Sequence, residues 1–473
     1  MSLVAGLDSS TQSSKVEVRD LDTGHVVARA SAPHPPTTPP RSEQDPSAWW
    51  AAFESAWAGV GAPTVNAISV AGQQHGMVVL DAAGNVVRPA KLWNDTETAP
   101  DAGWLRKQLP GGAADWAAQC GSVPVAAFTI SKLSWLHRSE PENWARLASV
   151  VLPHDWLTHR LTGNLTTDRG DASGTGYWSA ASGEYCWDLL AIVDRDRDWT
   201  TVVPRVLAPL ESAGSWNGAV VAPGTGDNMA AALGLGLRTG DVVMSFGTSG
   251  TVFARAASPT ADATGAVAGF ADASGGHLPL VCTLNATKVT DAVARLLGVD
   301  HAGFDGLALS APRGAGGLTL LPYLDGERTP DRPKATGVLS GIRSDVGREQ
   351  LAAAAVEGVV CGLLDGLDAL RRHVPDVRRV IMVGGGARSA AYRQALADLC
   401  DLPVVVADAD EAVAAGACVQ AAAVLQQVHP EEIAAAWGLG GDHATPVDRS
   451  AAWSADAVAA VRGAYAALAD RSA

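Results

Sequence analysis

Short apolar segments alternate with polar turns at the start of the chain. An apolar run covers Leu3–Leu7 and ends at Asp8, and a polar turn follows over Ser9–Ser14. The stretch KVEVRD then alternates charged and apolar positions, as a strand with one buried face does. After a second turn, a further strand is expected over His25–Ala30. The pattern predicts three consecutive strands joined by two turns.

The second half of the chain repeats this opening. The apolar segment VVMSF leads into the turn Gly247–Gly250, and TVFARA follows it. A repeated unit of this kind indicates a duplicated fold, although two unrelated hairpins would give the same pattern. Because 473 residues are too many for one ordinary core, we expect an α/β protein with two domains, 1–240 and 241–473, and a nucleotide cleft between them.

Polar loops follow the predicted strands at four places: Asp8–Ser14, Gly72–Gly76, Gly247–Gly250 and Gly384–Ala387. Backbone N–H groups in such loops can hold phosphate oxygens, and glycine lets the backbone approach a ligand closely. The last loop lies between a predicted strand, Arg379–Val383, and a helix over Ala390–Leu399 that Ser389 caps. Its glycines do not follow the GxGxxG spacing, so a dinucleotide-binding fold is not supported.

Several helices are expected around these strands. One begins at Asp45-Pro46 and runs to Trp57, with Asp at the cap and Pro in the first turn. The Trp-rich region Asp101–Trp216 has a helical pattern and is expected to complete the first half. A long helix is predicted over Asp345–His373. The Ala-rich stretch from Asp410 onward is predicted to form helix that packs against the rest of the protein.

Asp227 begins a run of small residues suited to a helix, directly after a Gly/Pro-rich loop. One interpretation is a helix N-cap, since Asp is a favoured capping residue. The other is a carboxylate that orients a reacting hydroxyl group. In either case the helix dipole is expected to lower the pKa of Asp227.

The loop Gly72–Gly76 is crowded with hydrogen-bonding side chains, from Gln73, Gln74 and His75. It is either a tight turn with exposed amides or a site where amide and imidazole groups meet the hydroxyls of a sugar or polyol. Trp93-Asn94-Asp95 follows another apolar stretch and could add an aromatic wall with two polar groups.

Composition and charge narrow the class of protein. A hydrophobic content of 47% with 18% charged residues is typical of a globular protein, and the net charge of −15 argues against a nucleic-acid surface. The six cysteines include no CxxC pair, which fits reduced thiols better than disulfides or a zinc site. With no signal-like N-terminus and no apolar run of membrane-spanning length, we expect a soluble, cytoplasmic protein without a membrane partner.

Eight stretches follow one another along the chain: LDSSTQSSKV, SEQDPSAWW, AGQQHG, LWND, GTGDN, SFGTSG, LPYLDGERTP and VGGGARS. In this order they resemble the FGGY carbohydrate kinases of the actin-like ATPase superfamily, essentially from end to end. The resemblance implies two ribonuclease-H-like domains with the active site in the cleft between them. The N-terminal domain would bind the sugar and the C-terminal domain most of the nucleotide.

The resemblance also implies roles for single residues. Asp227 would be the catalytic base, and the residues in contact with the sugar would be Gln74, His75, Asp227 and Asn228. Asp8 and Asp227 would hold Mg²⁺. The residues in contact with ATP would be Asp8, Thr11, Lys15, Gly247, Thr248, Gly385, Gly386 and Ala387. The chain departs from the family in two places: SSTQSSK replaces a loop that often contains GTS, and Glu97 lies where relatives often carry arginine.

The implied reaction is transfer of the ATP γ-phosphate to the terminal hydroxyl of a ketopentose. The stretches SEQDPSAWW and GQQHG are similar to those of members that phosphorylate D-xylulose to its 5-phosphate. Ribulose, ribitol, glycerol and gluconate are alternative substrates, since the family shares its phosphate loops. A non-catalytic sugar-sensing protein on the same fold is an alternative of another class. The resemblance is compatible with a homodimer.

Overall fold

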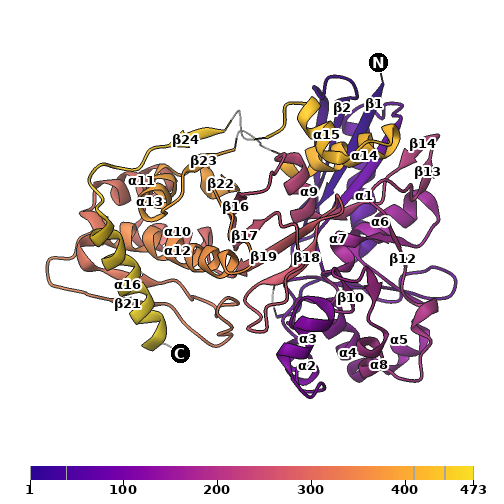
Figure 1. The fold of residues 1–473 in the computed structure, drawn as a ribbon, viewed down its shortest axis with the longest axis horizontal. Helices are drawn as coiled ribbons and strands as arrows, with labels where there is room; N and C mark the ends of the chain where they lie inside the picture. The colour runs from indigo at the N-terminus through magenta and orange to yellow at the C-terminus, as the bar shows by residue number, and fades with distance from the viewer. Residues whose placement is uncertain (1, 39, 408–410, 441–443, 472–473) are drawn as a thin grey trace. The chain divides into compact units, whose positions relative to one another are not determined.

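The computed structural model describes residues 2–38, 40–407, 411–440 and 444–471 (Figure 1). The chain forms two compact units. Unit 1 contains Met1–Leu237, Ala256–Pro279 and Asp410–Gly440, and unit 2 contains Arg238–Arg255, Leu280–Ala409 and Gly441–Ala473. The first boundary lies near the predicted one at 240/241. Neither unit is one continuous stretch of chain, however, because two segments of the second half, Ala256–Pro279 and Asp410–Gly440, belong to unit 1.

The main sheet of unit 1 is mixed, with the order β13-β14-β5-β1-β2-β3 and β15 paired with β5. Strand β1 lies between an antiparallel neighbour, β2, and a parallel one, β5. The bounds are β1 Leu3–Ser9, β2 Ser13–Asp20, β3 Val26–Pro33, β5 Ala67–Gly72, β13 Gly214–Trp216, β14 Ala219–Val221 and β15 Thr225–Gly226. The three opening strands predicted from the sequence are confirmed.

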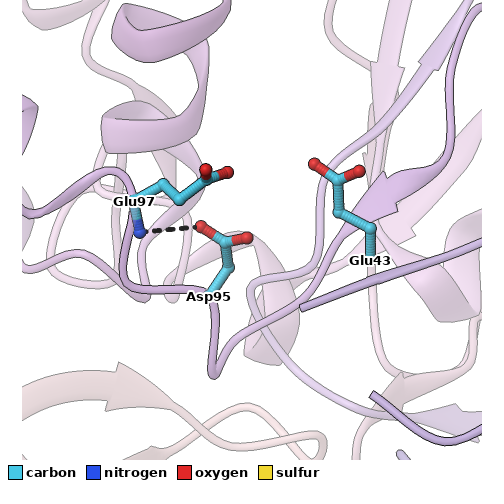
Figure 2. Close-up of side chains that lie close together, drawn as sticks. All are labelled: Glu43, Asp95 and Glu97. Atoms are coloured by element: carbon cyan, nitrogen blue, oxygen red, sulfur yellow. Dashed lines mark hydrogen bonds between the residues drawn. The ribbon is translucent and has the colours of Figure 1, made fainter. Parts of the chain in front are cut away.

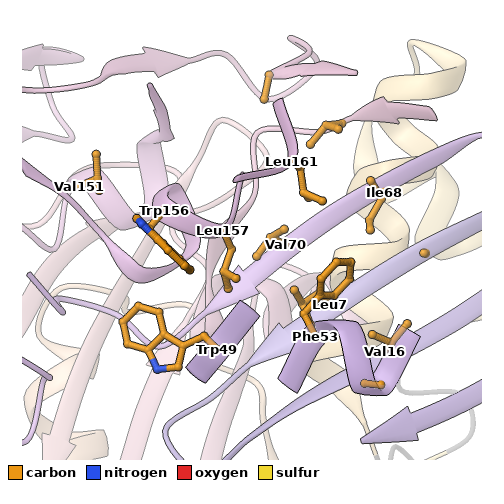
Figure 3. Packing of buried hydrophobic residues seen from close by; sticks show 14 of the residues in the cluster. Leu7, Val16, Trp49, Phe53, Ile68, Val70, Val151, Trp156, Leu157 and Leu161 are labelled. Carbon is orange, nitrogen blue, oxygen red and sulfur yellow. The ribbon is translucent and has the colours of Figure 1, made fainter. Parts of the chain in front are cut away.

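Helices cover both faces of this sheet. On one face, α1 (Pro46–Gly59) and α6 (Pro153–Thr162) bury a core that includes Trp49, Phe53 and Trp156 against the strands (Figure 3). The predicted start of α1 is confirmed, since the Asp45 side chain accepts the N–H of Ser47 at 2.9 Å. Because alternate residues of a strand face opposite sides, Leu7 joins this core while Gly6 faces the other layer.

The opposite face is covered by α14 (Ala412–Gln426) together with α9 (Asp227–Gly234). The backbone of α14 lies so close to β1 that a Cβ on Gly6 would be 2.2 Å from the carbonyl oxygen of Ala414. This packing explains why the segment around α14, which is distant in sequence, belongs to unit 1.

The rest of unit 1 is a mixture of short helices and two-stranded ribbons. The region predicted as helical over 101–216 also contains the ribbon pairs β9–β12 and β10–β11, and strand β8, which pairs with β6 outside this region. The bounds are β4 Glu43–Gln44, β6 Val78–Leu80, β7 Ala90–Lys91, α2 Ala99–Leu105, α3 Ala113–Cys120, α4 Thr129–Ser139, α5 Pro141–Arg146, β8 Ser149–Val151, β9 Thr166–Asp168, α7 Arg169–Ala172, β10 Trp178–Ser179, β11 Glu184–Tyr185, α8 Trp187–Val193, η1 Trp199–Thr201, β12 Arg205–Leu207, β18 Ala268–Ala271 and α15 Pro430–Ala436.

Unit 2 repeats the strand arrangement of unit 1. Strand β16 pairs antiparallel with β17 and parallel with β22, as β1 pairs with β2 and β5. The strands follow the order β19-β17-β16-β22-β23-β24. Their bounds are β16 Asp241–Phe246, β17 Gly250–Ala254, β19 His277–Thr283, β22 Arg379–Val383, β23 Val404–Val406 and β24 Thr445–Val447. The predicted duplication is therefore confirmed.

The helices of unit 2 include α12 (Arg348–Arg371). This helix corrects the expectation that no apolar run of the chain reaches membrane-spanning length. Within the described residues, α12 is long and apolar enough to cross a membrane by length and composition, but 72% of its apolar window is buried inside the protein. Such burial is what the core helix of a globular domain shows. The other elements are α10 Thr287–Leu297, α11 His301–Ser310, η2 Arg313–Gly317, β20 Thr319–Leu321, β21 Val338–Ser340, η3 Gly385–Arg388, α13 Ala390–Leu399 and α16 Ala455–Arg471.

The contact between α9 and α14 gives a stability prediction. A Cβ on Gly416 would lie 1.8 Å from the carbonyl oxygen of Ala230, so Gly416→Ala forces the two helices apart. We expect the substitution to lower the free energy of unfolding by about 1–3 kcal/mol or more, since overpacking a tight contact costs this much. Urea-induced unfolding followed by circular dichroism measures the change.

Gly463→Ala is the matched control, because Gly463 is exposed in α16 and no described atom lies within 4 Å of its added Cβ. Alanine there is expected to raise the free energy of unfolding by about 0.5–1 kcal/mol through its better helix propensity. Equal stability of the Gly416→Ala variant and the wild type would contradict the close packing.

Candidate functional site

Asp8 lies near the end of β1 and is almost completely buried. Lys15 is its cross-strand partner on β2, with Nζ 3.8 Å from Asp8 Oδ2 and 2.7 Å from Glu411 Oε2. Burial raises the pKa of Asp8 to about 7, although the Lys15 charge opposes the shift. The second carboxylate oxygen, Oδ1, is buried without a hydrogen-bond partner among the described residues.

Asp227 is the first residue of α9, and the N-cap position is occupied by Gly226. The N-cap interpretation of Asp227 is therefore wrong. The expected lowering of its pKa is also wrong: removal from water, with the nearby charges of Asp8 and Asp171, raises the pKa of Asp227 to about 7. These effects outweigh the dipole of a helix of only eight residues.

The loop after β5 meets the start of α9. Because β15 pairs parallel with the end of β5, Asn228 is brought next to Gln74. The Asn228 amide Nδ2 donates to Gln74 Oε1 at 2.8 Å and to Asp227 Oδ1 at 2.9 Å. The structure thus brings together three of the residues that the sequence predicts for sugar contact.

His75, the fourth of these residues, has a left-handed backbone with φ of 64°. Its ring packs against Phe128 and Phe270, with centroid distances of 5.0 and 5.4 Å. Nδ1 lies 2.8 Å from the carbonyl oxygen of Gly174. Since a carbonyl only accepts, the proton of a neutral His75 ring resides on Nδ1 and orients the imidazole.

Thr11 connects the turn after β1 with the two loops beside it. Its hydroxyl donates to Gln73 Oε1 at 3.2 Å and accepts the indole N–H of Trp93 at 2.9 Å. Three further buried polar atoms, Gln73 Nε2, Gln74 Nε2 and Asn94 Oδ1, have no hydrogen-bond partner in the described part of the chain. Buried polar groups are normally paired, so these atoms, with Asp8 Oδ1, mark where a polar ligand would complete the bonding.

The predicted nucleotide residues of unit 2 also lie together. The carbonyls of Gly247 and Thr248 accept the N–H groups of Thr287 and Ala286, which fixes the turn after β16. Next to it, a Cβ on Gly386 would lie 2.7 Å from Phe246 Cβ. Ala387 is buried, whereas Gly385 is exposed and its added Cβ would meet no described atom within 4 Å. The close contact with Phe246 thus explains the glycine at 386, whereas Gly385 faces open space. The predicted cleft between the two halves stays a prediction.

Glu97 belongs to a cluster of three acidic side chains with Glu43 and Asp95, whose carboxylates approach a common space (Figure 2). That space is taken by the buried ammonium group of Lys91. Its Nζ lies 2.8 Å from Asp95, 2.8 Å from Glu97 and 3.2 Å from Glu43, above the ring of Trp135. The cluster therefore carries its own cation, and Glu97 serves to hold the loop that contains Trp93 and Asn94.

The sequence analysis missed a second buried cluster, which we call the His154 cluster: His154, Asp155, Asp168 and Asp171. His154 Nδ1 lies 2.7 Å from Asp171, and Nε2 lies 3.1 Å from Asp155 and 3.8 Å from Asp168. Burial disfavours the imidazolium, but the three carboxylates outweigh it and raise the pKa of His154 to about 9. The available signal was the concentration of acidic residues in PHDW and TTDRGDA, short segments that the fold buries.

Comparison with known proteins gives consistent matches along the chain. The model of the FGGY family of carbohydrate kinases, N-terminal domain, matches residues 3–234, and that of the C-terminal domain matches residues 242–425. A xylulose kinase of Streptomyces rubiginosus is 47% identical over 92% of this chain and 90% of its own length. One of Escherichia coli K12 is 35% identical over 83% of this chain and 84% of its own. The crystal structure of xylulose kinase from Bifidobacterium adolescentis superposes with a TM-score of 0.85, at 41% identity and 99% coverage of both chains.

The Lys91 cluster yields a prediction about stability. Lys91→Met leaves the fully buried Asp95 without its cation, and breaking a buried ion pair in this way costs about 3–5 kcal/mol. We expect a loss of this size in urea unfolding at neutral pH. Glu97→Gln, which changes a carboxylate that is about a quarter exposed, is the control and should cost about 1 kcal/mol or less. Wild-type stability of Lys91→Met would contradict the assignment of Lys91 as the central cation.

Proposed function

Because this chain belongs to the FGGY family of carbohydrate kinases, we propose that it transfers the γ-phosphate of ATP to the terminal hydroxyl of D-xylulose, giving D-xylulose 5-phosphate. The choice of sugar is supported by the relatives named xylulose kinases. The observation that carries the mechanism is the hydrogen-bonded set Gln74–Asn228–Asp227. A homodimer and a cytoplasmic location stay predictions.

Asp227 is the residue that we assign to the reacting hydroxyl. Phosphoryl transfer has a loose transition state, in which the protein mainly positions groups and balances charge. The Asp227 carboxylate, held by Asn228 at 2.9 Å, orients the terminal hydroxyl of the sugar and accepts its proton as the O–P bond forms.

The sugar is held by polar groups that the protein leaves unpaired. The amide nitrogens Gln73 Nε2 and Gln74 Nε2 are buried donors with no partner among the described residues, and they suit sugar hydroxyl or carbonyl oxygens. The other residues that we assign to the sugar, His75 and Asn228, are already oriented by hydrogen bonds within the protein. Four groups in fixed directions provide the basis for distinguishing one pentulose from its stereoisomers.

The phosphate side of the site is assigned to residues of both units. In unit 1, the ammonium group of Lys15 on β2 and the backbone at Thr11 in the turn after β1 would contact the phosphates, and Lys15 balances the charge of Asp8. In unit 2, the turn at Gly247-Thr248 would contact the phosphates, and Gly385, Gly386 and Ala387 the nucleoside. Together these groups would bind and orient ATP.

Asp8 fits the requirements of a divalent cation. Its Oδ1 is a buried carboxylate oxygen that no described residue pairs with, and Mg²⁺ at phosphate sites prefers few carboxylates and several waters. We propose that Asp8, with Asp227 as the second carboxylate, holds Mg²⁺ through such waters. When bound, the ion would neutralise the phosphate oxygens.

The first test is ADP release from Mg-ATP with D-xylulose, D-ribulose, L-xylulose, L-ribulose, ribitol, glycerol and gluconate. D-xylulose is expected to give the highest kcat/KM. Asp227→Ala and Asp227→Asn are expected to lower kcat about 10²–10⁴-fold, the usual contribution of an acid–base residue, with ATP still bound. An active Asp227→Ala enzyme would refute the assignment of the base, and a preference for another substrate would refute the assignment of the sugar.

The nucleotide assignment has its own test in Gly385→Val. The exposed Gly385 has no described atom within 4 Å of an added Cβ, so the fold should be unchanged while the side chain obstructs the nucleoside. We expect at least about a tenfold rise in the Kd for ATP, equivalent to about 1.4 kcal/mol, in titration calorimetry. Gly306→Val, equally open on α11, is the control, and unchanged ATP affinity in Gly385→Val would contradict the assignment.

A further inference from the structure

The His154 cluster is in direct contact with both loops of the proposed sugar site. A Cβ on Gly72, at the start of the loop with Gln74 and His75, would lie 3.0 Å from the backbone nitrogen and Cβ of His154. A Cβ on Gly224, which precedes Asp227 by three residues, would lie 2.5 Å from His154 Cδ2. The backbones of the two loops therefore rest on the same histidine. The contact at Gly72 is tight, and Gly224, with a φ of 80°, leaves no room for a side chain.

The carboxylates of the cluster extend this contact by hydrogen bonds. Asp168 Oδ2 accepts the hydroxyl of Thr225 at 2.7 Å, on the short strand that leads directly into Asp227. The Asp171 carboxylate lies beside the backbone of His75 and 2.7 Å from His154 Nδ1. Gly174 donates its N–H to the carbonyl of Asp171, and its own carbonyl oxygen lies 2.8 Å from His75 Nδ1. Asp168 thus holds the entry to α9, and the turn that starts at Asp171 holds the ring of His75.

The charge balance of the cluster depends on His154. Three buried carboxylates, Asp155, Asp168 and Asp171, surround the single imidazole, and each of them raises its preference for a proton. Without a positive charge the acids would be left buried and uncompensated, or would take up protons and lose their acceptor capacity. Either change would weaken the bond to Thr225 and the contact of Asp171 with the loop that contains His75.

We propose that His154 is a positioning residue for phosphoryl transfer: its imidazolium keeps Asp168 and Asp171 ionised, and these two carboxylates set the relative position of His75 and Asp227. This inference rests on the proposed function, because it uses the roles given there to His75 and Asp227. His154 itself is buried behind the glycine contacts and acts through its neighbours.

Two substitutions separate the charge of His154 from its shape. His154→Gln removes both ring and charge, whereas His154→Lys removes the ring and keeps a cation. For His154→Gln we expect kcat/KM for the sugar to fall about 10–100-fold, the range seen when the orienting neighbours of functional groups are changed, with KM for ATP unchanged. His154→Lys should recover at least about a third of wild-type kcat/KM.

His159→Gln, on the same helix α6 but bonded only to the carbonyl oxygen of Asn164 in the described contacts, is the control and should retain wild-type kinetics. Wild-type activity of His154→Gln would overturn the proposal. So would equal impairment of His154→Lys and His154→Gln in properly folded proteins, since the positive charge would then not be what positions the loops. Thermal unfolding shows which variants are folded. If both His154 variants fail to fold, Asp171→Asn, which keeps the His154 ring, supplies a second test. It should lower kcat/KM for the sugar and leave KM for ATP unchanged, and wild-type kinetics of this variant would overturn the proposal.

A measurement without turnover keeps this proposal separate from the proposed function. In protein labelled with ¹⁵N-histidine, the His154 signals, assigned by their absence in a His154 variant, should be those of a doubly protonated ring at pH 8. An ordinary histidine, with a pKa of about 6.5, is neutral there. A neutral His154 at pH 8 would overturn the inference, whereas a charged ring in a protein that phosphorylates none of the sugars would leave the cluster standing and refute the proposed function.

Discussion

The parallel pairing of β5 with its two neighbours is the constraint on which the site in unit 1 depends. Strand β1 pairs with one edge of β5, and β14 and β15 pair with the other. Parallel strands end at the same edge of a sheet, where ligand sites of α/β proteins are found. Asp8, the loop Gly72–Gly76 and Asp227 therefore meet there although they are far apart in sequence. The corresponding pair in unit 2, β16 and β22, brings Gly247 and Gly384–Ala387 together for the same reason.

In three places in unit 1, a cation lies between two or three acidic side chains. Lys15 lies between Asp8 and Glu411, Lys91 among Glu43, Asp95 and Glu97, and His154 among three aspartates. In the second and third of these clusters a carboxylate also accepts a hydrogen bond from a neighbouring segment: Asp95 from the N–H of Ser42, and Asp168 from the hydroxyl of Thr225. Ion clusters of this kind are costly to bury. Their hydrogen bonds, however, fix the orientation of the side chains and loops that they join, which apolar packing does not do.

Much of the local structure could be predicted from the sequence because it depends on short-range rules. The strand Arg379–Val383, the Ser389 cap of α13 and the Asp45 cap of α1 agree with prediction, since each is set by residues within one or two turns. The loops at the strand ends were found in the same way. Within each unit the grouping of these loops follows from the sheet, because parallel strands end at the same edge.

The features that sequence reasoning missed depend on contacts over long distances in the chain. The raised pKa of Asp227 comes first from burial and then from the charges of Asp8 and Asp171, neither of which is near it in sequence. The His154 cluster joins α6, α7 and the end of β9, so no local pattern distinguishes its histidine from an exposed one. Likewise, Glu97 is marked in the sequence only as a departure from a frequent arginine, and its pairing with Lys91 is visible only once β7 and the loop after it are in place.

The position of α14 has a consequence for the order in which the protein can fold. Strands β1, β2 and β5 are complete once about the first seventy residues are made, yet α14, which covers one face of their sheet, begins only at Ala412. During synthesis, which proceeds from the N-terminus, that face and its glycine positions stay uncovered until nearly the whole chain has left the ribosome. The first half of the protein therefore lacks part of its own core until α14 is made, and the face of the sheet that α14 covers is apolar surface open to other chains until then.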